Sequence, residues 1–268
     1  MPDITTYTAD VSICSQICRL AIQEFGLTDT KNVDVDIEYA MENYEPWFVR
    51  LQPKMTVPVM DYAGELIGDS KEILYYLAAK HPEANLYPQD DAAEIDAFVS
   101  QFYDNFLFVG VFTFGHLQGR SEALRDFIVL GKTEVTQQKV RALAEDPEFA
   151  DVAGGKLAEV EQRDFTRLAD PTFLARADEG IRAMLTTLEA SLSKSEYVCG
   201  DSYSLADIVA TALLARVHFI NGTDWFTSDI HAYWSRMLER PSFESANVVA
   251  NFEDALMAEQ FAAYVDQN

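Results

Sequence analysis

The feature that most constrains this chain is a change of pattern near residue 82, because strand patterns occur only before it. The segments rich in strand formers are residues 4–8, 33–37, 57–60 and 65–67. Two amphipathic patterns, over about 15–25 and from Ser70 to about 81, predict helices between and after these strands. The order β-α-β followed by β-β-α predicts one small sheet with helices on its faces.

The segment 82–91 is polar and bounded by prolines, which indicates a linker. Beyond it no convincing strand pattern occurs, and apolar residues recur at helical spacing, as over 174–192. The segment 119–171 is charged and weakly periodic, so we expect a long insertion between two core helices there. The sequence therefore predicts two domains, an α/β domain over 1–82 and an all-helical domain over 92–268.

Charge and composition exclude several classes of protein. The chain has 44 acidic against 20 basic residues, and the excess is spread along its whole length. Such a surface repels nucleic acid and anionic membranes. No stretch approaches the roughly 20 apolar residues of a membrane span, and the first residues lack the pattern of a signal peptide. Three scattered cysteines suit a reducing compartment, so we expect a cytoplasmic protein.

The first candidate site is Ser12-Ile13-Cys14-Ser15, between the first strand and the first helix. A helix N-terminus offers free N–H groups and a positive dipole end, which stabilise an anion such as a thiolate. Ser12 could donate to a bound thiolate, and Cys14 would itself have a pKa below the roughly 8.5 of a free cysteine. The alternative is a plain N-cap at Ser12 and a small buried residue at Cys14.

Two further candidates follow along the chain. A cis bond at Val57-Pro58 would turn the Val57 backbone outward, where it could pair with the backbone of a peptide ligand. The alternative is an ordinary edge-strand proline. At Asp69-Ser70, Ser70 could cap the next helix and, with the neighbouring carboxylate, hold an α-amino-acid head group. Its alternative is a plain N-cap.

Other patterns carry no predicted chemistry. Strand alternation should place Asp34, Asp36 and Glu38 on the solvent face, so we expect no metal site there. The four histidines also lack metal-ligand spacing. The phenylalanines between 98 and 114 are expected in the core, although some could line an apolar pocket facing Cys14.

Taken together, the three candidate sites resemble the glutathione site of the cytosolic glutathione transferases. Gln52-Pro53 is similar to the Asn-Pro that precedes the Val-Pro pair in that family. In the second domain, residues 197–207 resemble the family pattern in which a Gly-Asp turn leads into a helix. Ser204 and Asp207 should form a capping box at the start of that helix. Residues 240–243 resemble the end of the family's penultimate helix.

The resemblance implies a thioredoxin-like domain followed by a helical bundle, the glutathione transferase architecture. It also implies a homodimer that uses glutathione as co-substrate with a small hydrophobic electrophile, and no metal. The residues expected to bind glutathione are Ser12, Gln52, Lys54, Val57, Pro58, Asp69 and Ser70.

Within the family, the first site with Arg19 resembles zeta-class maleylacetoacetate isomerases and tetrachlorohydroquinone reductive dehalogenases. Further likeness to the dehalogenases lies in residues 42–46, 114–116, 214–216 and 223–225. Ile13 stands where the zeta enzymes have a second serine, which speaks against an isomerase. By this resemblance Ser12 supports the glutathione thiolate. Cys14 attacks a glutathionylated intermediate, and a second glutathione resolves the mixed disulfide.

Two other functions stay open at this point. One is a disulfide reductase or peroxidase in which Cys14 is the main nucleophile, and the other is a binding protein that keeps the fold without turnover. In either enzyme Cys14 should react faster than Cys18, one helical turn deeper, or Cys199 in the second domain.

Overall fold

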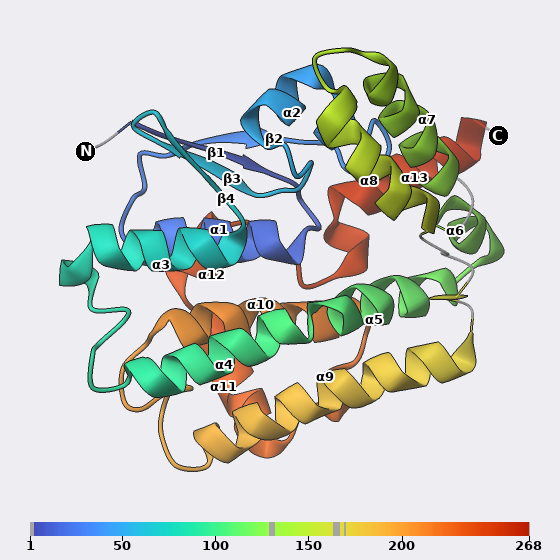
Figure 1. The fold of residues 1–268 in the computed structure, drawn as a ribbon. Helices are drawn as coiled ribbons and strands as arrows, with labels where there is room; N and C mark the ends of the chain where they lie inside the picture. Colours follow the sequence, from blue (N-terminus) through green and yellow to red (C-terminus); the bar gives the residue numbers. More distant parts are fainter. Residues whose placement is uncertain (1–2, 129–131, 163–166, 169, 268) are drawn as a thin grey trace.

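The computed structural model describes residues 3–128, 132–162, 167–168 and 170–267, and it begins with a small mixed sheet (Figure 1). The strands are β1 (Ile4–Thr8), β2 (Lys31–Asp34), β3 (Val59–Tyr62) and β4 (Glu65–Gly68), in the order β2-β1-β3-β4. β2 runs parallel to β1, whereas β3 and β4 are antiparallel to their neighbours. The predicted β-α-β, β-β-α order is therefore confirmed.

Helices cover both faces of this sheet. Helices α1 (Ile13–Glu24) and α3 (Ser70–Lys80) lie on one face, and α2 (Pro46–Leu51) lies on the other (Figure 1). Successive strand residues point to opposite faces. Accordingly Met60 belongs to the core shared with α1 and α3, and Val59 packs with Phe48 of α2.

The predicted strand over 33–37 is shifted, because the chain leaves the sheet after Asp34. One carboxylate oxygen of Asp36 accepts hydrogen bonds from the N–H groups of Glu38 (2.9 Å) and Tyr39 (2.8 Å). This turn ends the strand alternation. The side chain of Glu38 is consequently buried, so its prediction as a solvent-facing residue is wrong.

The chain beyond the sheet is helical in its described residues. The main helices are α4 (Ala92–Asp104), α5 (Phe106–Gln118), α9 (Pro171–Leu192), α10 (Leu205–Phe219), α11 (Ser228–Leu238), α12 (Pro241–Ser245) and α13 (Leu256–Gln267). Short 3₁₀ turns occur at Glu42–Tyr44, Pro82–Ala84, Thr223–Trp225 and Phe252–Asp254. Helix α10 is buried along almost its whole length and packs against both α1 and α4. No helix in the described ranges has the length and apolar character needed to span a bilayer.

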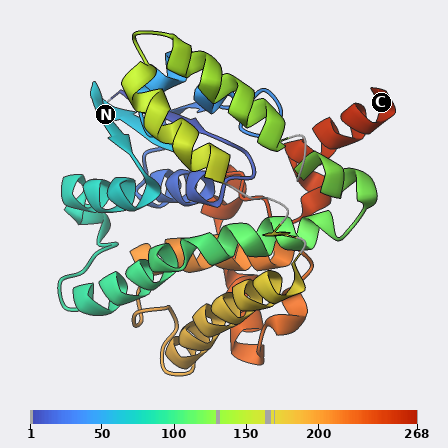
Figure 2. The same cartoon turned by 45° about the vertical axis from the view of Figure 1, so that its right-hand side comes forward.

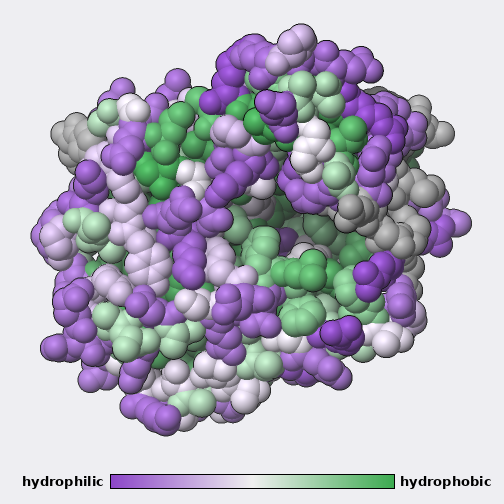
Figure 3. Space-filling view, viewed as in Figure 1, coloured by the Kyte–Doolittle hydropathy of each residue, from purple (hydrophilic) through white to green (hydrophobic). Residues whose placement is uncertain are grey.

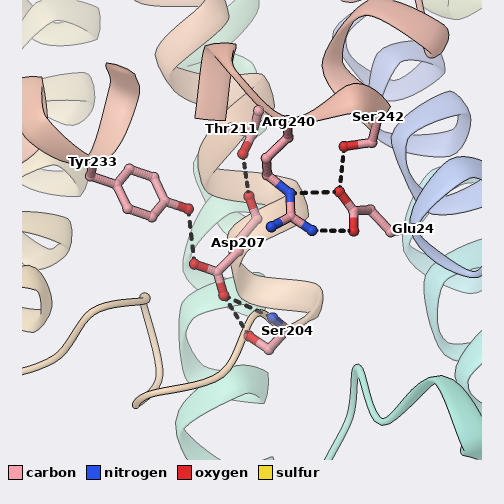
Figure 4. Close-up of polar contacts among 7 residues, drawn as sticks. All are labelled: Glu24, Ser204, Asp207, Thr211, Tyr233, Arg240 and Ser242. Carbon is pink, nitrogen blue, oxygen red and sulfur yellow. Dashed lines mark hydrogen bonds and ion pairs between the residues drawn. The ribbon is translucent and has the colours of Figure 1, made fainter. Parts of the chain in front are cut away.

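The start of α10 is fixed by a buried carboxylate (Figure 4). Asp207 accepts hydrogen bonds from the N–H groups of Val198 (3.0 Å) and Ser204 (2.9 Å) and from the hydroxyls of Ser204 (3.0 Å) and Tyr233 (2.9 Å). Burial raises the pKa of this carboxyl group to about 6. The predicted capping box at Ser204 and Asp207 is confirmed.

The described parts of 119–171 contain α6 (Glu122–Asp126), α7 (Lys132–Glu145) and α8 (Ala150–Gln162). Residues 129–131, 163–166 and 169 of the expected insertion lie outside the described residues. Helices α7 and α8 form a hairpin that lies beside α2 in both views (Figures 1 and 2). It has a small apolar core of its own, formed with the segment before β3: Met41, Tyr44, Val49, Met55, Val140, Leu143, Phe149, Ala153 and Val160.

Candidate active site

Ser12 caps the first helix at the turn that follows β1. Its hydroxyl oxygen accepts a hydrogen bond from the N–H of Ser15 at 3.2 Å, and the Ser15 hydroxyl accepts one from the N–H of Ala9 at 3.0 Å. Because Ser12 accepts in this contact, its O–H proton remains available for a ligand. Ser12 and Cys14 are both half-buried, so both border the turn.

Cys14 lies in the first turn of α1, where α3, α4 and α10 meet it. Burial raises the pKa of its thiol to about 12, and the negative charge of Asp69 acts in the same direction. A hydrogen bond from Ser70 and the positive charge of Arg216 lower the pKa of the thiol by less. The predicted low pKa is therefore wrong, because desolvation by the packed helices outweighs the effect of the helix terminus.

Acidity does not separate the three cysteines, but exposure does. Burial also raises the pKa of Cys18 and of Cys199 to about 12. All three are free thiols, and Cys14 is half-buried whereas Cys18 and Cys199 are buried. A reagent in solvent should therefore reach Cys14 first.

The start of α3 is built differently from the prediction. Asp69 is the N-cap, and its carboxylate accepts a hydrogen bond from the N–H of Lys71 at 2.9 Å. Ser70 is the first helical residue and is buried, with its hydroxyl 2.7 Å from that of Tyr103 on α4. Ser70 as the cap is wrong. Its hydroxyl instead joins Tyr103 and acts on Cys14.

The Val57-Pro58 bond is cis, as the sequence indicated. The Pro58 carbonyl accepts a hydrogen bond from the N–H of Asp69 at 3.3 Å, which ties the start of β3 to the start of α3. Within the part of the chain that the structure describes, the N–H and C=O of Val57 have no hydrogen-bond partner. They remain available to pair with an extended backbone.

Gln52 follows α2 and is buried against the end of β4. A Cβ atom at Gly68 would lie only 1.8 Å from its Nε2, so this close approach requires glycine. Its Oε1 accepts a hydrogen bond from the N–H of Lys54 at 3.3 Å. Gln52 therefore lies next to Asp69, whereas the Lys54 side chain is exposed.

Two arginines hold the turn after β1, and the sequence gave neither a role of its own in the site. Arg19 on α1 donates to the carbonyls of residues 9, 10, 246 and 247 and to the Thr8 hydroxyl. Arg216 on α10 is buried and donates to the carbonyl of Val11. A single arginine inside the apolar run 205–219 is the signal that could have drawn attention to Arg216.

The phenylalanines divide between the core and other surfaces. Phe102 and Phe112 are fully buried in the core, and Phe106 is exposed. Phe98 lines a separate cavity between α4 and α9 that also contains Cys199. The aromatic residue from α4 that reaches the Cys14 region is instead Tyr103. In the described ranges no three His, Cys, Asp or Glu side chains gather as a metal site.

The surface is hollowed beside these residues. Figure 3 shows the depression between the α7–α8 hairpin and α5, with apolar side chains gathered on its α5 side. The beginning of α1 borders this hollow in the same view. A hydrophobic molecule could therefore approach the β1–α1 turn from this side.

Comparison with known families agrees with this geometry. The model described as Glutathione S-transferase, N-terminal domain matches residues 11–80, and the one described as Glutathione S-transferase, C-terminal domain matches residues 171–236. This chain belongs to the glutathione S-transferase family.

Individual relatives show the same. The chain is 31% identical over 260 residues to the tetrachloro-p-hydroquinone reductive dehalogenase of Sphingobium chlorophenolicum, covering 96% of this chain and 100% of the relative. It is 25% identical over 251 residues to glutathione S-transferase TCHQD of Arabidopsis thaliana, covering 89% and 87%. The solved structure of beta-etherase LigF from Sphingobium sp. strain SYK-6 has a TM-score of 0.70 at 21% identity, covering 91% and 98%. The predicted family and its two-part architecture are thus confirmed.

Proposed function

We propose that this chain is a glutathione transferase that acts on a hydrophobic, aromatic electrophile, with Cys14 in thiol–disulfide exchange. The observation that carries the proposal is the convergence of the first turns of α1 and α3 at Cys14, where Ser70 and Tyr103 also meet. The similarity to a reductive dehalogenase over nearly the whole chain supports the aromatic substrate class.

In this proposal glutathione lies across the two helix N-termini. Asp69 and Ser70 hold its α-amino-acid end, and the free backbone groups of Val57, next to Pro58, pair with its backbone. Gln52 and Lys54 lie at its glycine end. The exposed position of Asp69 and the unpaired backbone of Val57 support this placement.

The chemistry then takes place at Ser12 and Cys14. Ser12 donates its O–H to the glutathione thiolate, which attacks the electrophile. The Cys14 thiolate next attacks the glutathionyl sulfur of the intermediate, the carbon–sulfur bond breaks, and the carbon takes up a proton. A second glutathione thiolate attacks the glutathione sulfur of the mixed disulfide, which releases oxidised glutathione and the Cys14 thiolate.

Three coarser features complete the proposal. We divide the chain into domains at 1–82 and 92–268 with an insertion over 119–171, supported by the sheet ending in α3 and the helices that start at Ala92. The three free cysteines support a cytoplasmic location. Exposed apolar side chains at Leu66, Phe106 and Leu107 support a homodimer interface. Light scattering at micromolar concentration should then give twice the 30.1 kDa of one chain.

Calorimetry with glutathione tests the binding site. The intact protein should bind, and Asp69→Asn should weaken binding about tenfold, which corresponds to one lost charged hydrogen bond. Glu72→Gln is the matched control, because it removes the same charge from an exposed residue one turn into α3. Absence of binding by the parent protein would overturn the glutathione proposal. Equal effects of the two substitutions would remove Asp69 from the site.

Oxidised glutathione tests the thiol chemistry. The Cys14 thiolate should displace one glutathione thiolate and carry a single glutathione per chain, located by mass spectrometry. An adduct on Cys18 or Cys199, or none, would make Cys14 a packing residue and leave Ser12 to carry a conventional transfer reaction. Assays with chlorinated hydroquinones, maleylacetone, hydroxyethyl disulfide and cumene hydroperoxide then separate dehalogenation, isomerisation, disulfide reduction and peroxide reduction.

A further inference from the structure

Arg216 is the only charged side chain in the fifteen residues of α10 apart from its capping Asp207. It is 5% exposed, and one terminal N–H of its guanidinium donates to the carbonyl of Val11, directly before Ser12. Helix α10 thus extends a positive charge from the second domain to the turn that carries Ser12 and Cys14.

This guanidinium has no counter-ion in the described part of the chain. No carboxylate lies within ion-pair distance of it, and its Nε is buried without a hydrogen-bond partner. Taking a charge out of water is costly unless it is paired. Burial accordingly lowers the pKa of Arg216 to about 10, although it stays protonated at neutral pH.

The other two arginines that join the domains are fully engaged. Arg240 forms a two-pronged ion pair with Glu24, at 2.9 and 2.6 Å (Figure 4). Arg19 donates five hydrogen bonds to the chain around it. Arg216 therefore differs from both in having donor capacity that the protein itself leaves unused.

Several charged and titratable groups surround Cys14. Asp69 and Ser70 act from α3, Tyr103 from α4, Cys18 from α1 and Arg216 from α10. On Arg216 itself, the negative charges of Glu38 and of a Cys14 thiolate act together. Arg216 is the only cation among the groups that act on Cys14 in the described residues.

We propose that Arg216 is a positioning residue whose charge stabilises the thiolate of Cys14. This inference rests on the proposed thiol chemistry at Cys14. The charge is needed twice, when the thiolate attacks the glutathionyl sulfur and when a second glutathione displaces that thiolate from the mixed disulfide. Arg216 remains protonated throughout and transfers no proton.

The test measures how fast iodoacetamide alkylates Cys14 between pH 7 and 9, by mass spectrometry of the Cys14 peptide and without glutathione. In this range the rate follows the thiolate fraction. Arg216→Gln, which removes the charge, should slow alkylation about tenfold at each pH, equivalent to one pKa unit. Arg216→Lys, which keeps the charge, should stay within about twofold of the parent. Arg240→Gln is the matched control and should leave the rate unchanged.

Parental rates in Arg216→Gln, or equal slowing in the glutamine and lysine variants, would overturn the inference, since packing and not charge would then be responsible. Circular dichroism melts identify a variant that fails to fold, and a lysine variant that folds with parental reactivity supports the inference by itself. The assay contains no glutathione. A parent protein that forms no Cys14 adduct with oxidised glutathione would therefore sink the proposed function without touching this result.

Discussion

The N-terminal domain is covered by later parts of the chain on two sides, and the two contacts are built differently (Figure 2). On the side of α1 and α3, helices α4 and α10 join the domain in one continuous apolar core. On the side of α2, the α7–α8 hairpin covers it through a separate core of nine buried residues. The first contact is part of the fold itself, whereas the second is an addition to it.

Their polar contacts differ in the same sense. The Arg240–Glu24 ion pair on the first side is partly buried, with 29% and 8% of the side chains exposed. The Arg50–Glu148 pair on the second side has 55% and 52% exposed. Water and salt weaken the exposed pair, so we expect the hairpin to open before the domains separate. The comparison teaches that the candidate site has one rigid wall and one separable one.

Asp207→Ala should have the largest effect, because it leaves the buried donors of Val198, Ser204 and Tyr233 unsatisfied. We expect a loss of about 3–5 kcal/mol in the free energy of unfolding, measured with urea. Asp201→Ala, in the exposed turn before α10, is the control and should change it by less than about 0.5 kcal/mol. Equal stabilities would mean that α10 does not hold the first contact together.

Phe149→Ala should come next, and its effect should be local. Removing this side chain from the hairpin core should lower the stability of α7 and α8 by about 3 kcal/mol. Hydrogen exchange should then accelerate in α7 and α8 while amides of α10 stay protected. Acceleration in α10 by the same factor would show that the two contacts unfold as one unit.

Arg240→Met should destabilise the first contact by about 2 kcal/mol, because Glu24 loses both charged hydrogen bonds and stays mostly buried. Thermal unfolding measures the loss. The double variant with Glu24→Gln should recover part of it, since no charge is then left unpaired. A single variant as stable as the parent would contradict the distinction between the two ion pairs.

Arg50→Ala should have the smallest effect, at most about 1 kcal/mol, because both partners of its ion pair are half-exposed. The difference from the parent should shrink at 1 M salt, where the Debye length is only about 3 Å. A loss as large as that of Phe149→Ala, unaffected by salt, would instead mean that Arg50 acts by packing on the Phe149 ring, 5.2 Å away.

The sequence could predict what depends on neighbours along the chain. Strand and helix periodicity gave the order of elements, and Ser204 with Asp207 gave the capping box. The Val57-Pro58 cis bond and the burial of Cys18 were also accessible, because the first is a property of X-Pro and the second follows from helical spacing. The placement of glutathione on these residues stays a prediction.

Only the tertiary structure decided the environment of the candidate site. The pKa of Cys14 is raised and not lowered, because α3, α4 and α10 remove water from the first turn of α1. Ser70 gives the cap to Asp69 because its hydroxyl meets Tyr103 from another domain. The unpaired charge of Arg216 beside Val11 has the same origin. Desolvation and long-range contacts depend on segments far apart in the chain, whereas periodicity and capping depend only on residues within a few positions.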